Sequence, residues 1–497
     1  METREIPGYY YDPDKKKYFK VVKNAPAAAA YSAESVKRRK LEHDKAQKAR
    51  IAEGYKKRSI RRSRTLQDPL LGGFLARELG TPPKDLLVDC WSRGLCSKGS
   101  VRLGLPRMGR ASAEHLFLGT ADEKRGLGIA IGSIGDGLHG TFIPRDENDR
   151  IVQDTAAPFW MQEGHYLELV PQVSSLKYHE PSSKLLVTSR DPGVAGGIYS
   201  LTFDSTAPAL PAPDGTSPPG WDLRRPNLTH MHNWSRQRNS KGRVANTCAP
   251  APAANSSLIC VVGTSRGLGC YSSNGTMLWL ENLSSVPPHL KAGPPPASDI
   301  LSIDFLPNNP QTVLAGLRGS RKICLADLRQ NAREWEWIVH RSSPAHVRCL
   351  SEHHVLAAGP NHSMSIYDLR FRFRETSRNR PVVIFPEYRN DVQIHFGLDV
   401  DTSLGVVAAA NHPPPMGPMG QGMSIFSLET GKRLDVPAVR HVVQDSPPNA
   451  LVFHTLPREP NASLFVSRAG VGCVVEKFSL GGDHDEWTGE NFGPLAF

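Results

Sequence analysis

Long apolar runs are missing from this chain of 497 residues. No window holds the roughly 18 uninterrupted apolar residues that a membrane-spanning helix needs. The opening stretch, METREIPGYYYDPDKKKYFK, also lacks the apolar centre of a signal peptide. We therefore expect a cytosolic or nuclear protein that makes no contact with a membrane.

Paired cysteines are missing as well. The chain has eight cysteines, yet none forms a C-x-x-C pair, so the sequence gives no support for a zinc site. Several cysteines lie in apolar, strand-like runs, where reduced thiols behave as small apolar side chains. We expect free thiols in a reducing compartment, and neither a metal nor a cofactor.

Catalytic motifs are incomplete wherever they begin to appear. GTSRG, at Gly263–Gly267, fits the G-x-S-x-G pattern in which Ser265 would be a nucleophile, but that motif needs a helix after the serine. The next residues, LGCYSSNG, favour a strand and a turn instead. The glycines of RGLGIAIGSIGDG lie inside and after a strand, whereas a dinucleotide site needs them between a strand and a helix. The sequence therefore predicts a protein that is not an enzyme.

Positive charge is abundant but confined to one segment. Residues 37–64 hold 13 Lys and Arg against 3 acidic residues, which accounts for +10 of the net charge of +11. Such a basic arm can act as a nuclear-import signal, contact the phosphates of a nucleic acid, or be a helix that is merely solvated. The residues singled out for import or phosphate contact are Lys37, Arg38, Arg39, Lys40, Lys56, Lys57 and Arg58.

The basic arm belongs to an N-terminal extension, residues 1–67, which we expect to be helical or disordered over the arm. Ahead of the arm, the sequence of residues 6–21, IPGYYYDPDKKKYFKV, predicts a Tyr-rich hairpin that turns at Asp12–Lys15. Its aromatic rings can stack on bases or simply pack the hairpin. At the other end of the chain, residues 481–497 form a short tail.

Repeated short strands define the body, residues 68–480. A β-branched or aliphatic run followed by turn residues occurs seven times, at steps of 42 to 73 residues, and the shortest step matches one four-stranded propeller blade. The longer steps contain Pro-rich stretches such as STAPALPAPDGTSPPG, which belong in surface loops because proline donates no ladder hydrogen bond. Long helical patterns are absent from the body. The fold class is therefore all-β, a seven-bladed β-propeller.

The tripeptide DLR occurs three times. Asp327–Arg329, in ICLADLRQ, and Asp368–Arg370, in SIYDLRF, are 41 residues apart, which is one blade, and each follows an apolar strand. The third copy, WDLR at residues 221–224, lies 105 residues before Asp327 and follows SPPG rather than a strand. We therefore interpret the two later copies as equivalent positions in neighbouring blades and the first as a coincidence.

The two equivalent copies have a simple physical interpretation. An aspartate that ends a strand accepts backbone N–H bonds in the following turn. The arginine two residues later carries a planar fork of donors that suits a carboxylate or carbonyl of a partner. Two such arginines on adjacent blades form one patch for a partner protein. The alternative is that both pairs only tie the blades together.

These residues carry a resemblance to a known family. The paired apolar–Asp–x–Arg pattern resembles the WDxR signature of the WD-repeat cullin-4-associated factors, and IPGYYYDPDKKKYFKV with FLARELG, at Phe74–Gly80, is similar to the N-terminal region of a member of that family. The family's Trp is Ala326 in one copy and Tyr367 in the other. The resemblance implies a WD-repeat propeller that presents a protein substrate to a cullin-4 RING ubiquitin ligase. The residues it implies for binding the ligase's adaptor propeller protein are Asp327, Arg329, Tyr367, Asp368 and Arg370.

A second function stays open beside this one. A nuclear WD-repeat scaffold for RNA processing or ribosome assembly would use the Tyr-rich hairpin and the basic arm to contact nucleic acid, and its DLR sites would be structural. In both readings we expect the protein in the nucleus, with the cytoplasm as a second location.

Overall fold

The chain falls into two units, Met1–Pro83 and Lys84–Phe497. In the first unit, strands β1 (Tyr9–Asp12) and β2 (Lys17–Lys20) pair antiparallel, with Tyr10 opposite Phe19. The computed structural model describes residues 9–12, 17–20, 42, 45, 84–104, 110–124, 126–152, 164–191, 196–203, 223, 226–233, 243–280, 299–330, 335–370, 380–391, 396–412, 422–440 and 447–481.

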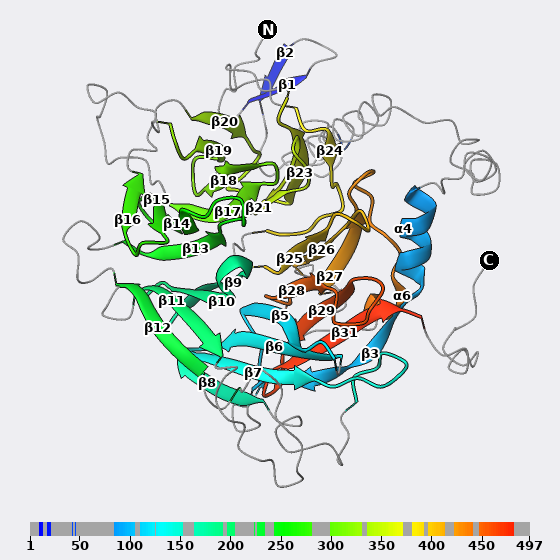
Figure 1. Cartoon of the computed structure of the whole chain (residues 1–497). Coiled ribbons are helices and arrows are strands. Elements are labelled where there is room, and N and C mark those ends of the chain that lie inside the picture. Colours follow the sequence, from blue (N-terminus) through cyan, green and yellow to red (C-terminus); the bar gives the residue numbers. More distant parts are fainter. Residues whose placement is uncertain are drawn as a thin grey trace, which may run out of the picture. The chain divides into compact units, whose positions relative to one another are not determined.

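Seven antiparallel sheets follow one another round a ring in the second unit (Figure 1). Blades 1 to 3 consist of β5 (His115–Asp122), β6 (Leu127–Ile134), β7 (Gly137–Ile143) and β8 (His165–Leu169); β9 (Val173–His179), β10 (Lys184–Ser189), β11 (Gly197–Phe203) and β12 (Pro226–Asn233); and β13 (Ala245–Pro250), β14 (Leu258–Thr264), β15 (Gly267–Ser272) and β16 (Met277–Leu280). Blades 4 and 5 consist of β17 (Ile300–Leu306), β18 (Asn309–Leu317), β19 (Lys322–Asp327) and β20 (Glu336–Val339); and β21 (His346–Cys349), β22 (His354–Gly359), β23 (Ser363–Asp368) and β24 (Val383–Ile384). Blade 6 has β25 (Leu398–Asp401), β26 (Val406–Ala410) and β27 (Met423–Ser427), and blade 7 has β28 (Leu451–His454), β29 (Ser463–Arg468), β31 (Val474–Leu480) and β3 (Leu95–Arg102). The predicted seven-bladed β-propeller is therefore confirmed.

The repeat pattern matches the blades with one exception. Six of the seven apolar runs are the second strands of blades 2 to 7, but the first run, HLFLGTAD, is β5, the innermost strand of blade 1. The second strand of that blade is β6, LGIAIGSI, in which every residue is buried. Because the two glycines of β6 indicate turns in the sequence, the repeat pattern falls on β5 in blade 1 instead of on β6.

The hydrophobic core lies between blades rather than within them. Each of the seven buried clusters joins residues of two adjoining blades, for example Leu314 and Ile323 of blade 4 with Val355 of blade 5. Burying one such Leu, Ile or Val side chain contributes about 1.5–3 kcal/mol. Blades therefore stabilise one another in sequence round the ring, which explains why every strand needs one or both faces apolar.

Blade 7 is built from two distant parts of the chain. Strand β3 pairs antiparallel with β31, with Leu95 opposite Leu480, so the ring closes through backbone hydrogen bonds between them (Figure 1). The short strands β4 (Arg110–Ala111) and β30 (Gly470–Val471) form a second pair beside it. Closing the sheet in this way removes two strand edges that would otherwise be exposed.

Blade 6 has three strands among the described residues, and a helix packs beside it. Helix α4 (Lys84–Arg93) places Val88 and Trp91 in the same buried cluster as Met423 and Ile425 of β27. The short helix α6 (Pro437–Arg440) adds to this cluster. Helix α4 lies inside the segment for which the sequence predicted only strands. The helix is too short for its apolar residues, spaced three and four positions apart, to show a clear helical pattern.

Strand direction alternates within each blade, so the connections divide between two faces of the ring. Turns from first to second strand and from third to fourth strand lie on one face, which we call the DLR face because Asp327 ends β19 and Asp368 ends β23 there. Turns from second to third strand lie on the opposite face.

All eight cysteines are free thiols. No helix among the described residues is both long and apolar enough to cross a membrane.

Candidate functional site

The two in-register DLR segments occupy equivalent positions in neighbouring blades. Asp327 is the last residue of β19 and lies opposite Thr312 of β18, while Asp368 is the last residue of β23 and lies opposite His354 of β22. Strands β19 and β23 are the third strands of blades 4 and 5. The spacing of one blade therefore places both turns on the DLR face.

Each aspartate holds the turn that follows it and the arginine at its end. In blade 4, Asp327 Oδ1 accepts the backbone N–H of Arg329 at 3.0 Å, Arg329 Nε donates to the same oxygen at 3.0 Å, and Nη2 donates to Oδ2 at 2.8 Å. In blade 5 the corresponding distances between Arg370 and Asp368 are 2.9, 3.1 and 2.7 Å. Both turns thus form the same two-pronged arginine–carboxylate clamp.

The arginines are exposed while their aspartates lie below the surface. The side chains of Arg329 and Arg370 are 64% and 56% exposed, against 17% and 5% for Asp327 and Asp368. Within the described part of the chain, the guanidinium of Arg329 bonds to Asp327 alone and keeps its Nη1 donors for another molecule. The clamp already restricts the rotamers of each arginine. Less side-chain entropy is therefore lost when a partner binds there.

The clamps extend the ionised range of both carboxylates to more acid pH. The hydrogen bonds from Arg370 lower the pKa of Asp368 to about 2, and those from Arg329 lower the pKa of Asp327. The same bonds raise the pKa of each arginine. The charge pattern of both turns is therefore constant over the whole physiological pH range.

Tyr367 supports the blade 5 turn from inside the core. It is 5% exposed, and its hydroxyl is hydrogen-bonded to Nδ1 of His340 at 2.9 Å. Nε2 of His340 is in turn 3.1 Å from the hydroxyl oxygen of Ser363, and burial lowers the pKa of His340 to about 4. Tyr367 was predicted as part of the adaptor-binding set, but its ring faces blade 4, so it positions Asp368 rather than offering a surface contact.

A tryptophan supports the blade 4 turn in place of the small Ala326. Ala326 is fully buried, and Trp335 belongs to the same cluster between blades 3 and 4. Nε1 of Trp335 donates to the backbone carbonyl of Asp327 at 3.0 Å. The DLR motif could not predict that Trp335 supports this turn, because Trp335 lies eight positions after Asp327.

The third DLR copy differs in its place within the blade. Strand β11 ends at Phe203 and β12 begins at Pro226, so residues 221–224 lie just before a fourth strand instead of directly after a third. Of these four residues the structure describes Leu223, which is buried in the cluster between blades 1 and 2. Its place before β12 separates it from the two equivalent copies.

The basic arm, residues 37–64, with its predicted import and phosphate contacts, lies outside the described residues except for Glu42 and Lys45, and so does most of the tail.

The glycine motifs lie in ordinary blade geometry. Ser265 occupies the turn between β14 and β15, with a strand after it in place of the helix that a nucleophile motif needs. Gly128 and Gly132 lie within β6. No group of three or more His, Cys, Asp or Glu side chains in the described ranges is placed to hold a metal ion.

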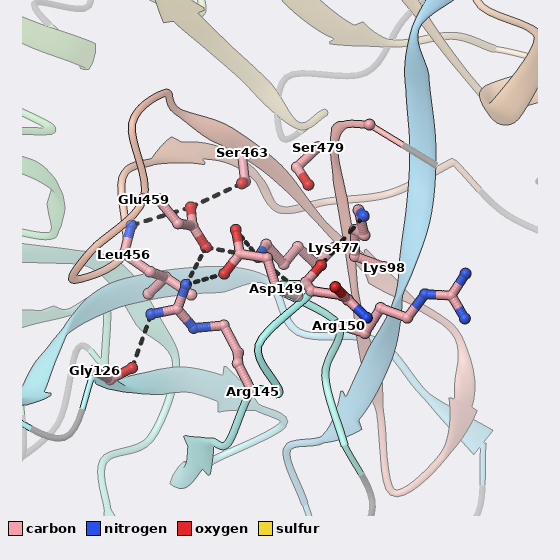
Figure 2. Close-up of polar contacts among 12 residues, drawn as sticks. Lys98, Gly126, Arg145, Asp149, Arg150, Leu456, Glu459, Ser463, Lys477 and Ser479 are labelled. Atoms are coloured by element: carbon pink, nitrogen blue, oxygen red, sulfur yellow. Dashed lines mark hydrogen bonds and ion pairs between the residues drawn. The ribbon is translucent and has the colours of Figure 1, made fainter. Parts of the chain in front are cut away.

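A buried ion network that the sequence did not indicate joins blades 7 and 1 (Figure 2). Nζ of Lys477, which is fully buried, contacts Glu459 Oε1 at 2.6 Å, the carbonyl of Asp149 at 2.9 Å and Asp149 Oδ2 at 3.4 Å. Arg145 bonds to Asp149 and, at 2.6 Å, to Glu459 Oε1. Two cations thus face two carboxylates, and the three donors of the ammonium are satisfied. The network fastens the loop after β7 to blade 7.

No family model and no curated protein sequence matches the chain. Among solved structures, the chain is similar to the WD40 β-propeller domain of Doa1, with 10% identity, 80% of this chain and 99% of that chain covered, and a TM-score of 0.47. It is also similar to Raptor of Chaetomium thermophilum, with 13% identity, 82% of this chain covered and a TM-score of 0.47, and it spans about a third (32%) of that chain. Because both TM-scores are below 0.5, the fold rests on the sheet topology of this chain alone.

Proposed function

We propose that the protein is a non-enzymatic, WD-repeat substrate receptor of a cullin-4 RING ubiquitin ligase, and that it docks on the ligase's adaptor propeller through Arg329 and Arg370. The observation that carries the proposal is the pair of exposed, identically clamped arginines in blades 4 and 5. The resemblance of both turns to the WDxR signature of the cullin-4-associated factors supports the choice of partner.

The supporting residues have separate parts in this proposal. Asp327 and Asp368 orient the arginines and remain below the surface, so a partner meets guanidinium groups rather than carboxylates. Trp335 and Tyr367 hold the two turns from the core. The fold alone does not select this function, because β-propellers serve many roles. The substrate, a protein, binds elsewhere on the ring, and the complex acts in the nucleus.

Affinity purification with identification of the bound proteins tests the docking. The double variant Arg329→Ala with Arg370→Ala should lose the adaptor, because both surface donors are removed while the turns and the core stay in place. Co-purification at the wild-type level would overturn the proposal.

A matched control is available on the opposite face. Arg266 and Arg318 are exposed arginines in the second-to-third strand turns of blades 3 and 4, which are also neighbours. The double variant Arg266→Ala with Arg318→Ala removes the same charge from adjacent blades and should retain the adaptor. A loss of adaptor in both double variants would show that net charge, rather than the DLR face, decides the binding.

The scaffold for RNA processing or ribosome assembly makes a different prediction. RNA binding would weaken with salt and disappear when residues 1–67 are deleted, whereas the double variant at Arg329 and Arg370 would bind RNA unchanged. Filter binding of the full chain and of the deletion at two salt concentrations separates the two functions.

A further inference from the structure

The centre of the ring holds a cavity of about 970 Å³, lined by residues of the first strands of all seven blades. This volume lies at the upper end of the range for small-molecule sites in proteins. Its charged lining comprises three cations, Lys177 from β9, Arg190 after β10 and Arg348 from β21, and three carboxylates, Glu114, Glu180 and Asp399. Two of the cations, Lys177 and Arg348, come from the first strands of blades 2 and 5.

Lys177 and Arg348 are not neutralised by close carboxylates. Among the described residues, neither makes an ion pair within 4.0 Å, and the Arg348 guanidinium bonds to one group, the carbonyl of Val347, at 3.4 Å. The positive charge of Arg348 is also the largest cause of the lowered pKa of Lys177, ahead of burial. The two cations therefore repel each other, and an anion between them would relieve that repulsion.

The two nearby carboxylates are already engaged in joining blades. Asp304 Oδ2 accepts the backbone N–H of Cys349 in the next blade at 2.7 Å, and Asp399 Oδ2 accepts that of Phe453 at 2.8 Å. Burial raises the pKa of both aspartates, against the lowering effect of Arg348. These carboxylates balance the cations over a longer distance, but their hydrogen-bonding capacity is directed at the backbone instead of at Lys177 or Arg348.

We infer that the central cavity is a binding site for a small oxyanion, a phosphate or a polycarboxylate, held between Lys177 and Arg348. Both cations line the cavity, from blades 2 and 5, whereas the hydroxyl oxygens of the neighbouring Ser175 and Ser302 accept the backbone N–H groups of Cys248 and Val347. A volume of this size fits a free metabolite. None of the DLR residues lines this cavity, so the test of the site is independent of the cullin-4 proposal.

Lysine footprinting of the full chain tests the site without any substitution. The protein is acetylated with a limiting reagent in the presence of inorganic phosphate, pyrophosphate or citrate, and the modification of each lysine is read by mass spectrometry. We expect at least one of these anions to protect Lys177 while Lys432, exposed after blade 6, stays equally reactive. Protection by the phosphates alone or by citrate alone identifies the class of oxyanion.

Calorimetric titration of the protecting anion then assigns the donors. The variants Lys177→Gln and Arg348→Gln should each bind it at least tenfold more weakly, because each loses a charge-assisted hydrogen bond. Lys432→Gln is the matched control and should bind like the wild type. The proposal is overturned if Lys177 reacts equally with and without all three anions at millimolar concentration, or if Lys177→Gln binds as tightly as the wild type.

Discussion

The ring contains two kinds of arginine–carboxylate arrangement, and they differ in the distance along the chain over which they act. In the DLR turns, each arginine binds an aspartate two residues away and remains more than half exposed. In the network between blades 7 and 1, Arg145 binds Glu459 across 314 residues of chain and Lys477 binds Asp149 across 328 residues, and Lys477 and Glu459 are buried (Figure 2).

This difference separates a contribution to stability from availability for binding. A buried charge whose partner is removed keeps its full desolvation cost, so the network is sensitive to any single substitution. A pair whose arginine is exposed gains little from its ionic contact because water screens the guanidinium charge. The same chemical groups therefore fasten the ring in one place and leave donors for a partner in the other.

The largest expected effect is at the buried network. Lys477→Met leaves the buried Glu459 with Arg145 as its remaining ion-pair partner, and we expect the free energy of unfolding to fall by about 3–5 kcal/mol. Urea denaturation followed by tryptophan fluorescence measures it.

The double variant Lys477→Met with Glu459→Gln is the control for this prediction. Removing one charge of each sign restores the balance with Arg145 and Asp149, so it should recover part of the lost stability. A single variant as stable as the wild type would show that the network contributes nothing to closing the ring.

A smaller effect is expected behind the blade 5 turn, where His340 is buried without charge. Its pKa of about 4 in the folded chain is below the value of about 6.5 for an unfolded histidine. The unfolded chain therefore binds the extra proton first, and the stability that neutral His340 contributes above pH 6.5 is lost as the pH falls to 4. We expect a loss of up to about 1.4 kcal/mol per pH unit over this window.

His340→Gln isolates this contribution. Glutamine can still hydrogen-bond to Tyr367 or Ser363 but does not titrate, so the plot of stability against pH should be shallower for the variant between pH 6.5 and 4. Burial lowers the pKa of His139, His179 and His454 as well, and these residues set the slope that remains. Parallel curves for the variant and the wild type would contradict the assignment.

The smallest effect on stability is expected at the DLR turns. Arg329→Ala with Arg370→Ala should leave the urea midpoint unchanged within the error of the measurement, since both side chains are more than half exposed and water screens their charges. A clear shift in the midpoint would place these arginines with the buried network, as structural residues, and would weaken their proposed role in docking.

Local patterns were sufficient to predict the propeller and the register of the DLR turns. Repeated β-branched runs indicated the blades, and a spacing of 41 residues placed Asp327 and Asp368 at the same position in neighbouring blades. Both signals depend on residues close together in the chain. The glycines of β6 hid one strand, since glycine in a sequence indicates turns more often than buried strands.

Contacts between distant residues could not be predicted in the same way. Nothing in the sequence around Arg145 indicates Glu459 or Lys477, because their proximity arises only when the ring closes. The same holds for Lys177 and Arg348, which line the same cavity from blades 2 and 5. Trp335 shows the limit at shorter range, since its position fits no motif yet it supports the turn of Asp327.

The pairing of β3 with β31 has a consequence for how the protein is made. During synthesis, β3 is translated early and β31 late. Almost the whole propeller is therefore translated before β3 can pair with β31. Until then, the nascent polypeptide carries an open sheet edge, the kind of surface that chaperones shield and that other chains can capture. A polypeptide that terminates within blade 7 would therefore lack β31, and its preceding blades would remain an open ring with exposed sheet edges.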